Sequence, residues 1–248
     1  MGYYADDVIK IARAEVGYLE KASNKSLDSK TANAGSKNYT KYARDLDKIA
    51  GFYNGRKQGH SWCDVWTDWV FVQAFGAAAA KKLLCQPDKS LGAGCEYSMR
   101  YYKAKNQLYT SPKAGDQIFF KDADGDVIHT GIVYKVDNTY VYTVEGNTSS
   151  SSGVVANGGC VREKKYKLSY NRIAGYGRPA YDVKKAAVAI TTAAKDYQCI
   201  HTVVKGDRLW NIAKKYLGSG NRYKEIMKLN GKTSDVIVVG EKLKIPKK

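Results

Sequence analysis

The chain has 248 residues, a formal net charge of +17 and 44% hydrophobic residues. This length fits one large domain or a moderate domain followed by a small one, and the apolar content excludes a chain that is disordered throughout. No run of about 18 apolar residues is present, which excludes a membrane-spanning helix, and residues 1–11 show no secretory signal. The charge predicts an anionic partner, either nucleic acid or a phosphate-bearing cell wall.

The first predicted elements are two helices. Residues 7–17 place apolar side chains on one face of an amphipathic helix. A second helix is predicted to begin near Cys63, because the polar stretch 55–62 is followed by a strongly apolar helical pattern over residues 65–73. The start of a helix favours a thiolate, since its dipole and free N–H groups stabilise negative charge. Cys63 is therefore a candidate nucleophile, with an inert buried cysteine as the alternative.

Three strands of an antiparallel sheet are predicted next, at residues 117–120, 127–136 and 139–144. His129 begins the second strand and Glu145 ends the third. A hairpin at residues 137–138 would set these strands side by side, so that the carboxylate could reach the imidazole and fix its tautomer. Cysteine, histidine and acid suit acyl transfer by a nucleophile, a base and an orienting group. The alternative is a histidine with a structural role.

The remaining cysteines and acidic side chains predict neither a disulfide framework nor a cofactor. Five cysteines leave at least one unpaired, and no zinc-ligand spacing occurs. The aspartates of residues 122–126 could bind calcium, but the twelve-residue loop that ends in glutamate is missing. We favour a plain turn there and keep calcium as the alternative. Four cysteines have no predicted role: Cys85, Cys95, Cys160 and Cys199.

Four stretches together resemble the CHAP family of cysteine, histidine-dependent amidohydrolases/peptidases. They are SWCDVWTDWV from residue 61, AGDQIFF from residue 114, DVIHTGIVY from residue 126 and YTVEGN from residue 142. The resemblance implies an α+β, papain-like fold with N-terminal helices packed on an antiparallel β-sheet. It also implies that Cys63 is the nucleophile, His129 the general base and Glu145 the orienting acid. Asn147 would be an accessory polar residue near the site, and Gln58 is a candidate oxyanion donor.

A change of composition divides the chain. Residues 182–198 are rich in alanine and threonine and are predicted to be a linker. This gives a catalytic domain at residues 1–181 and a small domain at residues 199–248. The small domain carries a net charge of +8, which leaves +9 for the rest.

The pattern of the small domain predicts strand, helix, helix, strand, with Asp207 placed to cap the first helix. Three stretches resemble the LysM domain: HTVVKGDRLWNIAKKY from residue 201, YKEIMKLN from residue 223 and VGEKLKIP from residue 239. This resemblance implies binding to N-acetylglucosamine-containing glycans, chiefly peptidoglycan, between two loops. The loop residues that correspond here are Gly206, Asp207, Arg208, Leu209, Asn230, Gly231, Val236, Ile237 and Val238. Leu209 has a core position as its alternative.

The two resemblances together imply a peptidoglycan hydrolase of the endolysin or autolysin type, from a phage or prophage. It would be an N-acetylmuramoyl-L-alanine amidase or a peptide endopeptidase. We expect synthesis in the cytoplasm, release through a holin pore and action at the cell wall. The expected partners are peptidoglycan and anionic wall polymers, not nucleic acid. The alternative is a non-catalytic wall-binding protein. The bond cleaved, the target bacterium and the oligomeric state stay open.

Overall fold

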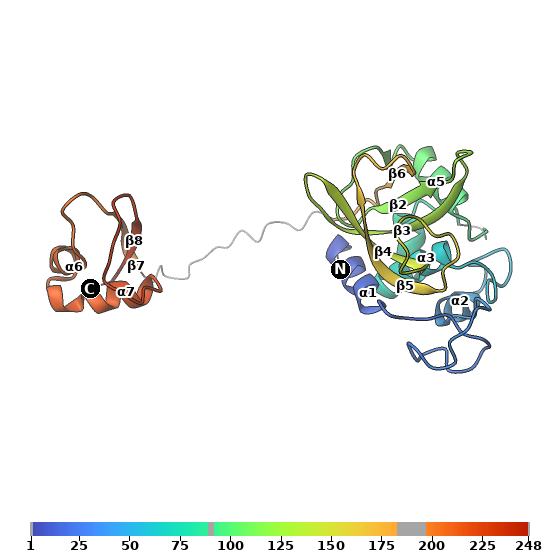
Figure 1. Ribbon diagram of the computed structural model, residues 1–248, viewed down its shortest axis with the longest axis horizontal. Helices are drawn as coiled ribbons and strands as arrows, with labels where there is room; N and C mark the ends of the chain where they lie inside the picture. The colour runs from blue at the N-terminus through green and yellow to red at the C-terminus, as the bar shows by residue number, and fades with distance from the viewer. Residues whose placement is uncertain (1, 89–91, 183–196, 248) are drawn as a thin grey trace. The chain divides into compact units, whose positions relative to one another are not determined.

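The computed structural model describes residues 2–88, 92–182 and 197–247. The predicted linker, residues 182–198, lies outside these ranges except at its two ends. The chain divides into two compact units, Met1–Val183 and Lys184–Lys248, called here the first and the second unit (Figure 1). No helix within the described ranges is long and apolar enough to cross a membrane.

The first unit is built around one buried helix. Its helices are α1 (Ala5–Ala14), α2 (Lys41–Asp47), α3 (Cys63–Phe75), α4 (Ala77–Leu83) and α5 (Cys95–Ala104). Helix α3 contacts the other four and also the strands β3 (Val127–Val136) and β4 (Tyr140–Thr148). Every residue from Cys63 to Phe71 is buried. Apolar side chains lie on every side of this helix, among them Val65, Trp66 and Val70, and they require such burial, which fixes the position of its first residue.

The helices pack on a six-stranded antiparallel sheet in the order β1-β6-β2-β3-β4-β5. Its other strands are β1 (Leu108–Tyr109), β2 (Gln117–Lys121), β5 (Cys160–Lys167) and β6 (Ile173–Gly177). Alternate side chains serve the two faces. Phe119, Ile132 and Val144 pack with the helices, whereas Phe120 and Val133 belong to a separate core on the other face. The predicted α+β class, with helices packed on an antiparallel sheet, is confirmed.

The hairpin turn between β3 and β4 fixes which residues of the two strands pair with each other. Asp137 closes the turn, because its Oδ1 accepts hydrogen bonds from the backbone N–H groups of Thr139 and Tyr140 at 2.9 and 2.8 Å. Strand β4 continues to Thr148, beyond the predicted end at residue 144, because it keeps pairing with β5. Glu145 therefore lies inside the strand rather than at its end.

The second unit has its own small core. It contains β7 (Tyr197–Thr202), α6 (Leu209–Leu217), the 3₁₀ turn η1 (Gly220–Arg222), α7 (Tyr223–Leu229) and β8 (Lys242–Pro246), with β7 and β8 antiparallel. This confirms the predicted βααβ order. Asp207 does not cap α6, whose N-cap residue is Arg208. The Asp207 carboxylate instead closes the preceding turn, where it contacts Val204 N and His201 Nε2 at 2.9 and 2.7 Å.

Candidate active site

Cys63 is the first residue of α3, as predicted. The preceding residue, Trp62, is held by a buried hydrogen bond from its indole Nε1 to Glu20 Oε2 at 2.9 Å. The backbone N–H of Asp64, in the first turn, is one of the groups that lower the pKa of the Cys63 thiol. The Cys63 side chain is 5% exposed. The thiol therefore lies at the positive end of a buried helix, where a thiolate is stabilised.

His129 and Glu145 come together across the neighbouring strands β3 and β4. His129 Nε2 and Glu145 Oε2 are 3.1 Å apart, and both side chains are fully buried. Gly131 leaves room for this contact, because a Cβ atom there would lie 2.6 Å from Glu145 Cγ. With Glu145 at Nε2, the other ring nitrogen, Nδ1, has no hydrogen-bond partner of standard geometry within the described ranges. Nδ1 is thus the ring atom left for the Cys63 sulfur.

Two further side chains hold the Glu145 carboxylate. Thr143 Oγ1 donates to Oε1 at 2.6 Å, and the Tyr166 hydroxyl donates to Oε2 at 3.2 Å. A carboxylate buried without water requires such partners to offset its lost hydration. Together with His129, these groups fix the carboxylate in a single orientation.

The electrostatics of the three side chains favour an ion pair. The hydrogen bond with Cys95, whose Sγ is 3.4 Å away, and the contact with His129 hold the pKa of the Cys63 thiol well below its usual range, although burial opposes this. Burial also disfavours the imidazolium, but the interactions with Cys63 and Glu145 outweigh it and raise the pKa of His129 to about 9. Each charged form stabilises the other, so the favoured state is a thiolate beside an imidazolium.

Asn147 lies close to this group but makes different contacts. Its backbone adopts a positive φ of 56°, which asparagine tolerates better than most residues. Its Nδ2 donates to Ser61 Oγ at 3.1 Å, and its Oδ1 accepts from Gly159 N at 3.1 Å. Asn147 therefore joins the segment that precedes Cys63 to the loop that follows β4.

The amide of Gln58 is engaged with the segment that leads into α2. Its Oε1 accepts from Thr40 N at 3.0 Å, while its Nε2 donates to Thr40 O at 3.0 Å and to Asn24 Oδ1 at 2.8 Å. The amide is thus committed to fixing this segment, and its role as an oxyanion donor stays a prediction.

Sequence reasoning missed three residues that the structure brings to the site: Cys95, Thr143 and Tyr166. Thr143 could have been found, because it lies two residues before Glu145 on a predicted strand and so shares its face. Cys95 and Tyr166 lie on α5 and β5, for which no element was predicted. Their proximity depends on tertiary packing and has no local signal.

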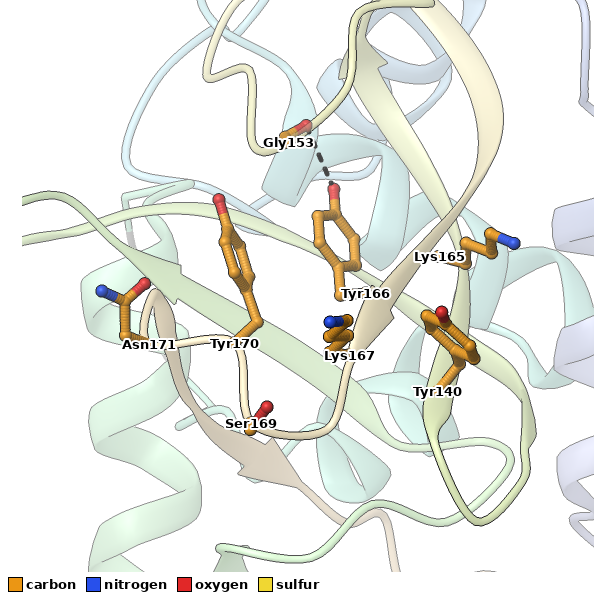
Figure 2. Close-up of a pocket in the computed structure, with 8 residues that line it drawn as sticks. All are labelled: Tyr140, Gly153, Lys165, Tyr166, Lys167, Ser169, Tyr170 and Asn171. Carbon is orange, nitrogen blue, oxygen red and sulfur yellow. Dashed lines mark hydrogen bonds between the residues drawn. The ribbon is translucent and has the colours of Figure 1, made fainter.

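A surface cavity of about 530 Å³ lies beside Tyr166. Figure 2 shows the rings of Tyr166 and Tyr170 standing side by side, with the Tyr166 hydroxyl directed at Gly153. The rings are stacked with centroids 5.4 Å apart, and the hydroxyl is 3.4 Å from Gly153 O. Because the same hydroxyl reaches Glu145, Tyr166 lies between this cavity and the buried acid. The full lining is Tyr140, Gly153, Lys165, Tyr166, Lys167, Ser169, Tyr170 and Asn171.

In the second unit, the segment before the first predicted glycan loop pairs with the segment after the second. Val203 N donates to Glu241 O and Val203 O accepts from Gly240 N, both at 2.8 Å. Val236 and Val238 are 67% and 66% exposed, which is unusual for valine and leaves an apolar surface for a ligand. Gly206, Arg208 and Gly231 are also exposed, and Asp207 is half-buried.

Three of the predicted glycan residues have roles inside the second unit. Leu209 is buried in its core, and Ile237 packs against that core. The Asn230 amide donates to Ile226 O and Lys244 O, both at 2.7 Å, and accepts from Lys244 N at 2.8 Å. Asn230 therefore ties α7 to β8. The core alternative given for Leu209 is the arrangement observed.

The fold and the buried cysteine, histidine and glutamate define a class of protein. It is an α+β unit with a thiol–imidazole–carboxylate group, followed by a small βααβ unit. Residues 55–147 match the CHAP domain family, and residues 201–246 match the LysM domain family. The chain thus carries a CHAP domain followed by a LysM domain, as the sequence motifs predict.

Among solved structures, the chain is similar to "The crystal structure of Ly7917", with 13% identity and a TM-score of 0.40 over 71% of this chain and 62% of that chain. It is also similar to "The crystal structure of Ly7917 with the hydrolyzing product of MDP", with 13% identity and a TM-score of 0.38 over 71% of this chain and 63% of that one. The chain therefore spans less than two thirds of the length of these structures. No curated protein matches the sequence significantly.

Proposed function

We propose that this protein is a peptidoglycan hydrolase whose CHAP unit cleaves an amide bond of the bacterial wall with Cys63 as the nucleophile. The observation that carries the proposal is the buried arrangement at the start of α3. The thiol of Cys63 interacts with an imidazole, His129, that hydrogen-bonds to Glu145 at 3.1 Å. An inert cysteine would need neither the imidazole nor the carboxylate behind it.

The proposed reaction begins with attack of the Cys63 thiolate on the amide carbonyl carbon. The negative charge that develops on the carbonyl oxygen is stabilised by N–H groups at the start of α3. His129, as imidazolium, donates its proton to the leaving amine, which gives a thioester and neutral imidazole. Neutral His129 then takes a proton from water, whose oxygen attacks the thioester. Collapse of this intermediate releases the carboxylic acid product and regenerates Cys63.

Glu145 and Asn147 have supporting roles in this proposal. Glu145 holds the imidazole so that Nδ1 faces the sulfur, and its charge stabilises the imidazolium. Asn147 fixes the chain on either side of the site through Ser61 and Gly159. Neither exchanges a proton with substrate.

The LysM unit is proposed to bind N-acetylglucosamine-containing glycan strands. Its support is the exposure of Val236 and Val238, together with the backbone pairing of Val203, before one loop, with Gly240 and Glu241, after the other. Binding would keep the CHAP unit close to its insoluble substrate, which raises the local concentration of cleavable bonds. The positive charge of both units suits the anionic polymers of the same wall.

The test of the catalytic role is Cys63→Ala. We expect this variant to lose clearing of purified walls while it still sediments with them, because the thiol is removed and the LysM unit is untouched. Cys199→Ala, which changes a cysteine of the second unit, is the matched control and should clear walls normally. Clearing by Cys63→Ala would contradict the mechanism. A wild-type protein that sediments with several wall types and clears none would favour a non-catalytic wall-binding protein.

Two further measurements refine the assignment. Mass spectrometry of digests of one defined peptidoglycan distinguishes an N-acetylmuramoyl-L-alanine amidase, which frees the amino group of L-alanine, from an endopeptidase, which shortens the peptides. Soluble N-acetylglucosamine oligomers should displace the Cys63→Ala variant from walls. Sedimentation that is insensitive to these oligomers would contradict the LysM role.

We further propose that the protein acts as an endolysin of a phage or prophage, released from the cytoplasm through a holin pore. The pairing of a wall hydrolase with a wall anchor supports this. Cells that produce the protein should stay intact until a holin is co-expressed, and lysis without a holin would contradict this route.

A further inference from the structure

The site contains a second thiol that the proposed mechanism does not use. Cys63 and Cys95 are 32 residues apart in sequence, yet their sulfur atoms are 3.4 Å apart. This separation is far longer than the ~2.05 Å of a disulfide bond, and both residues are free cysteines. The two side chains are 5% and 6% exposed. The contact is therefore a buried thiol pair.

Both cysteines occupy the same position in their helices. Cys63 begins α3, Cys95 begins α5, and neither helix has a side-chain hydrogen bond at its N-cap. The N–H groups of a first helical turn carry partial positive charge and lack partners within the helix. Because two such ends meet at the sulfur pair, the site stabilises one negative charge there.

The other ionisable groups near the pair determine which sulfur carries that charge. His129, on β3, lies beside Cys63 and favours a thiolate there. The Asp64 carboxyl, on α3, disfavours negative charge on Cys95, and burial raises the pKa of Asp64 and of Asp68, that of Asp68 to about 7. The contact with Cys63 and burial raise the pKa of Cys95 well above its usual range. Two adjacent thiolates would also repel each other.

We propose that Cys95 is a positioning residue for the cysteine nucleophile: its thiol donates a hydrogen bond to the Cys63 sulfur and holds it as a thiolate at the start of α3. The pair keeps one proton, which resides on Cys95. The inference rests on the proposed function, because it assigns the nucleophile to Cys63. Cys95 itself touches neither substrate nor leaving group.

This role has a kinetic signature. When the Cys63 sulfur attacks a carbonyl, its charge moves to the carbonyl oxygen, so the hydrogen bond from Cys95 is strongest before attack. It therefore increases the fraction of thiolate in acid but lowers the intrinsic reactivity of that thiolate. Removal of the donor should displace the pH dependence rather than abolish the reaction. A residue that only fills the core would change stability without moving the pH profile.

The test compares Cys95→Ala, which lacks the donor, with Cys95→Ser, which retains one. The rate of alkylation by iodoacetamide is measured at Cys63 alone, by peptide mass spectrometry of the full chain between pH 4 and pH 10. We expect the profile of Cys95→Ala to move toward alkaline pH, with an acid-side rate about tenfold lower for every pH unit by which the profile moves. Cys95→Ser should remain close to wild type. Cys85→Ala, which removes a buried thiol elsewhere, should leave the profile unchanged.

Because alkylation needs no peptidoglycan, it tests this inference separately from the proposed function. Coincident profiles for Cys95→Ala and wild type would overturn the role of Cys95, even if Cys63→Ala still abolishes lysis. If the alanine variant unfolds, the inference is decided by Cys95→Ser against Cys95→Val, which packs without donating, and equal profiles overturn it. Formation of a disulfide bond between Cys63 and Cys95 in air would also overturn the inference. Mass spectrometry would detect it as a loss of two hydrogen atoms and as a cross-link between the peptides that contain the two cysteines.

Discussion

At the scale of single residues, the unusual feature is a fully buried histidine that is expected to carry charge. Burial alone would keep His129 neutral, since an ion loses its hydration there. The contacts with Cys63 and Glu145 reverse this and raise its pKa to about 9. Charge in this core is thus stabilised only while all three groups are present. The order of the three side chains in the sequence predicts that they lie together in the fold. Their protonation states could not be predicted in this way, because they depend on burial and on the distances between the groups.

The first prediction concerns pH. The reactive state has a deprotonated Cys63 and a protonated His129, so kcat/KM on a soluble peptidoglycan fragment should fall as pH rises through about 9, where His129 loses its proton. The acid-side decline should lie well below the usual pKa of a thiol, because the pKa of Cys63 is lowered.

A stopped assay over pH 4–10 measures both declines. Glu145→Gln is the matched variant, and it should move the alkaline decline to lower pH because it removes a negative charge beside the imidazole. A rate that keeps rising to pH 10 would mean an ordinary thiol and would contradict the ion pair.

At the scale of secondary-structure elements, the sequence predicts those whose apolar residues repeat with a regular period. The strand over residues 127–136 and the start of the helix at Cys63 are observed as predicted, because their apolar side chains repeat with the period of a strand or a helix. Helix α5 was missed because one of its buried positions is polar, Ser98. Strand β5 was missed because charged residues dominate its sequence, CVREKKYK. Cys95 and Tyr166 were missed with them.

The second prediction concerns the paired strands β3 and β4. Gly131→Ala would place a Cβ atom 2.6 Å from Glu145 Cγ and 2.8 Å from Val144 O, so Glu145 must move away from His129. We expect kcat/KM to fall by about 100-fold, the scale of a misplaced catalytic group. The free energy of unfolding should fall by about 1–3 kcal/mol, as for other overpacked sites.

Steady-state kinetics and urea unfolding measure the two effects. Gly55→Ala is the control, because a Cβ atom at Gly55 would meet nothing within 4 Å. Wild-type kinetics in Gly131→Ala would show that the position of Glu145 does not limit the reaction.

At the scale of the whole molecule, the positive charge belongs to both parts of the chain. The net charge is +8 over residues 199–248 and +9 over the remainder. A charge confined to one groove would suggest a single anionic ligand, such as a nucleic acid strand. Positive charge on both parts instead favours binding to an extended anionic surface, one that is larger than the protein itself. The proposed substrate, a wall that carries phosphate polymers, has that character.

The third prediction follows from this charge. Sedimentation of Cys63→Ala with walls should weaken as salt rises, because the screening length falls to about 8 Å at 0.15 M ionic strength. Walls stripped of their phosphate polymers should show a flatter salt dependence, since the glycan contacts of the LysM unit remain. Equal salt dependence for both kinds of wall would contradict electrostatic attraction to these polymers. Displacement from walls by duplex DNA at physiological salt would favour the nucleic-acid alternative.

The contact between Tyr166 and the buried acid offers a way to observe the site without disturbing it. The ring of Tyr166 borders an open cavity (Figure 2), while its hydroxyl touches Glu145. Burial, followed by the charge and hydrogen bond of Glu145, raises the pKa of this tyrosine. Fluorotyrosine incorporated at this position would therefore report, through its ¹⁹F resonance frequency, the change in charge beside Glu145 when His129 loses and regains its proton. The catalytic cycle could then be followed by NMR from the opposite side of the carboxylate, with Cys63 and His129 unmodified.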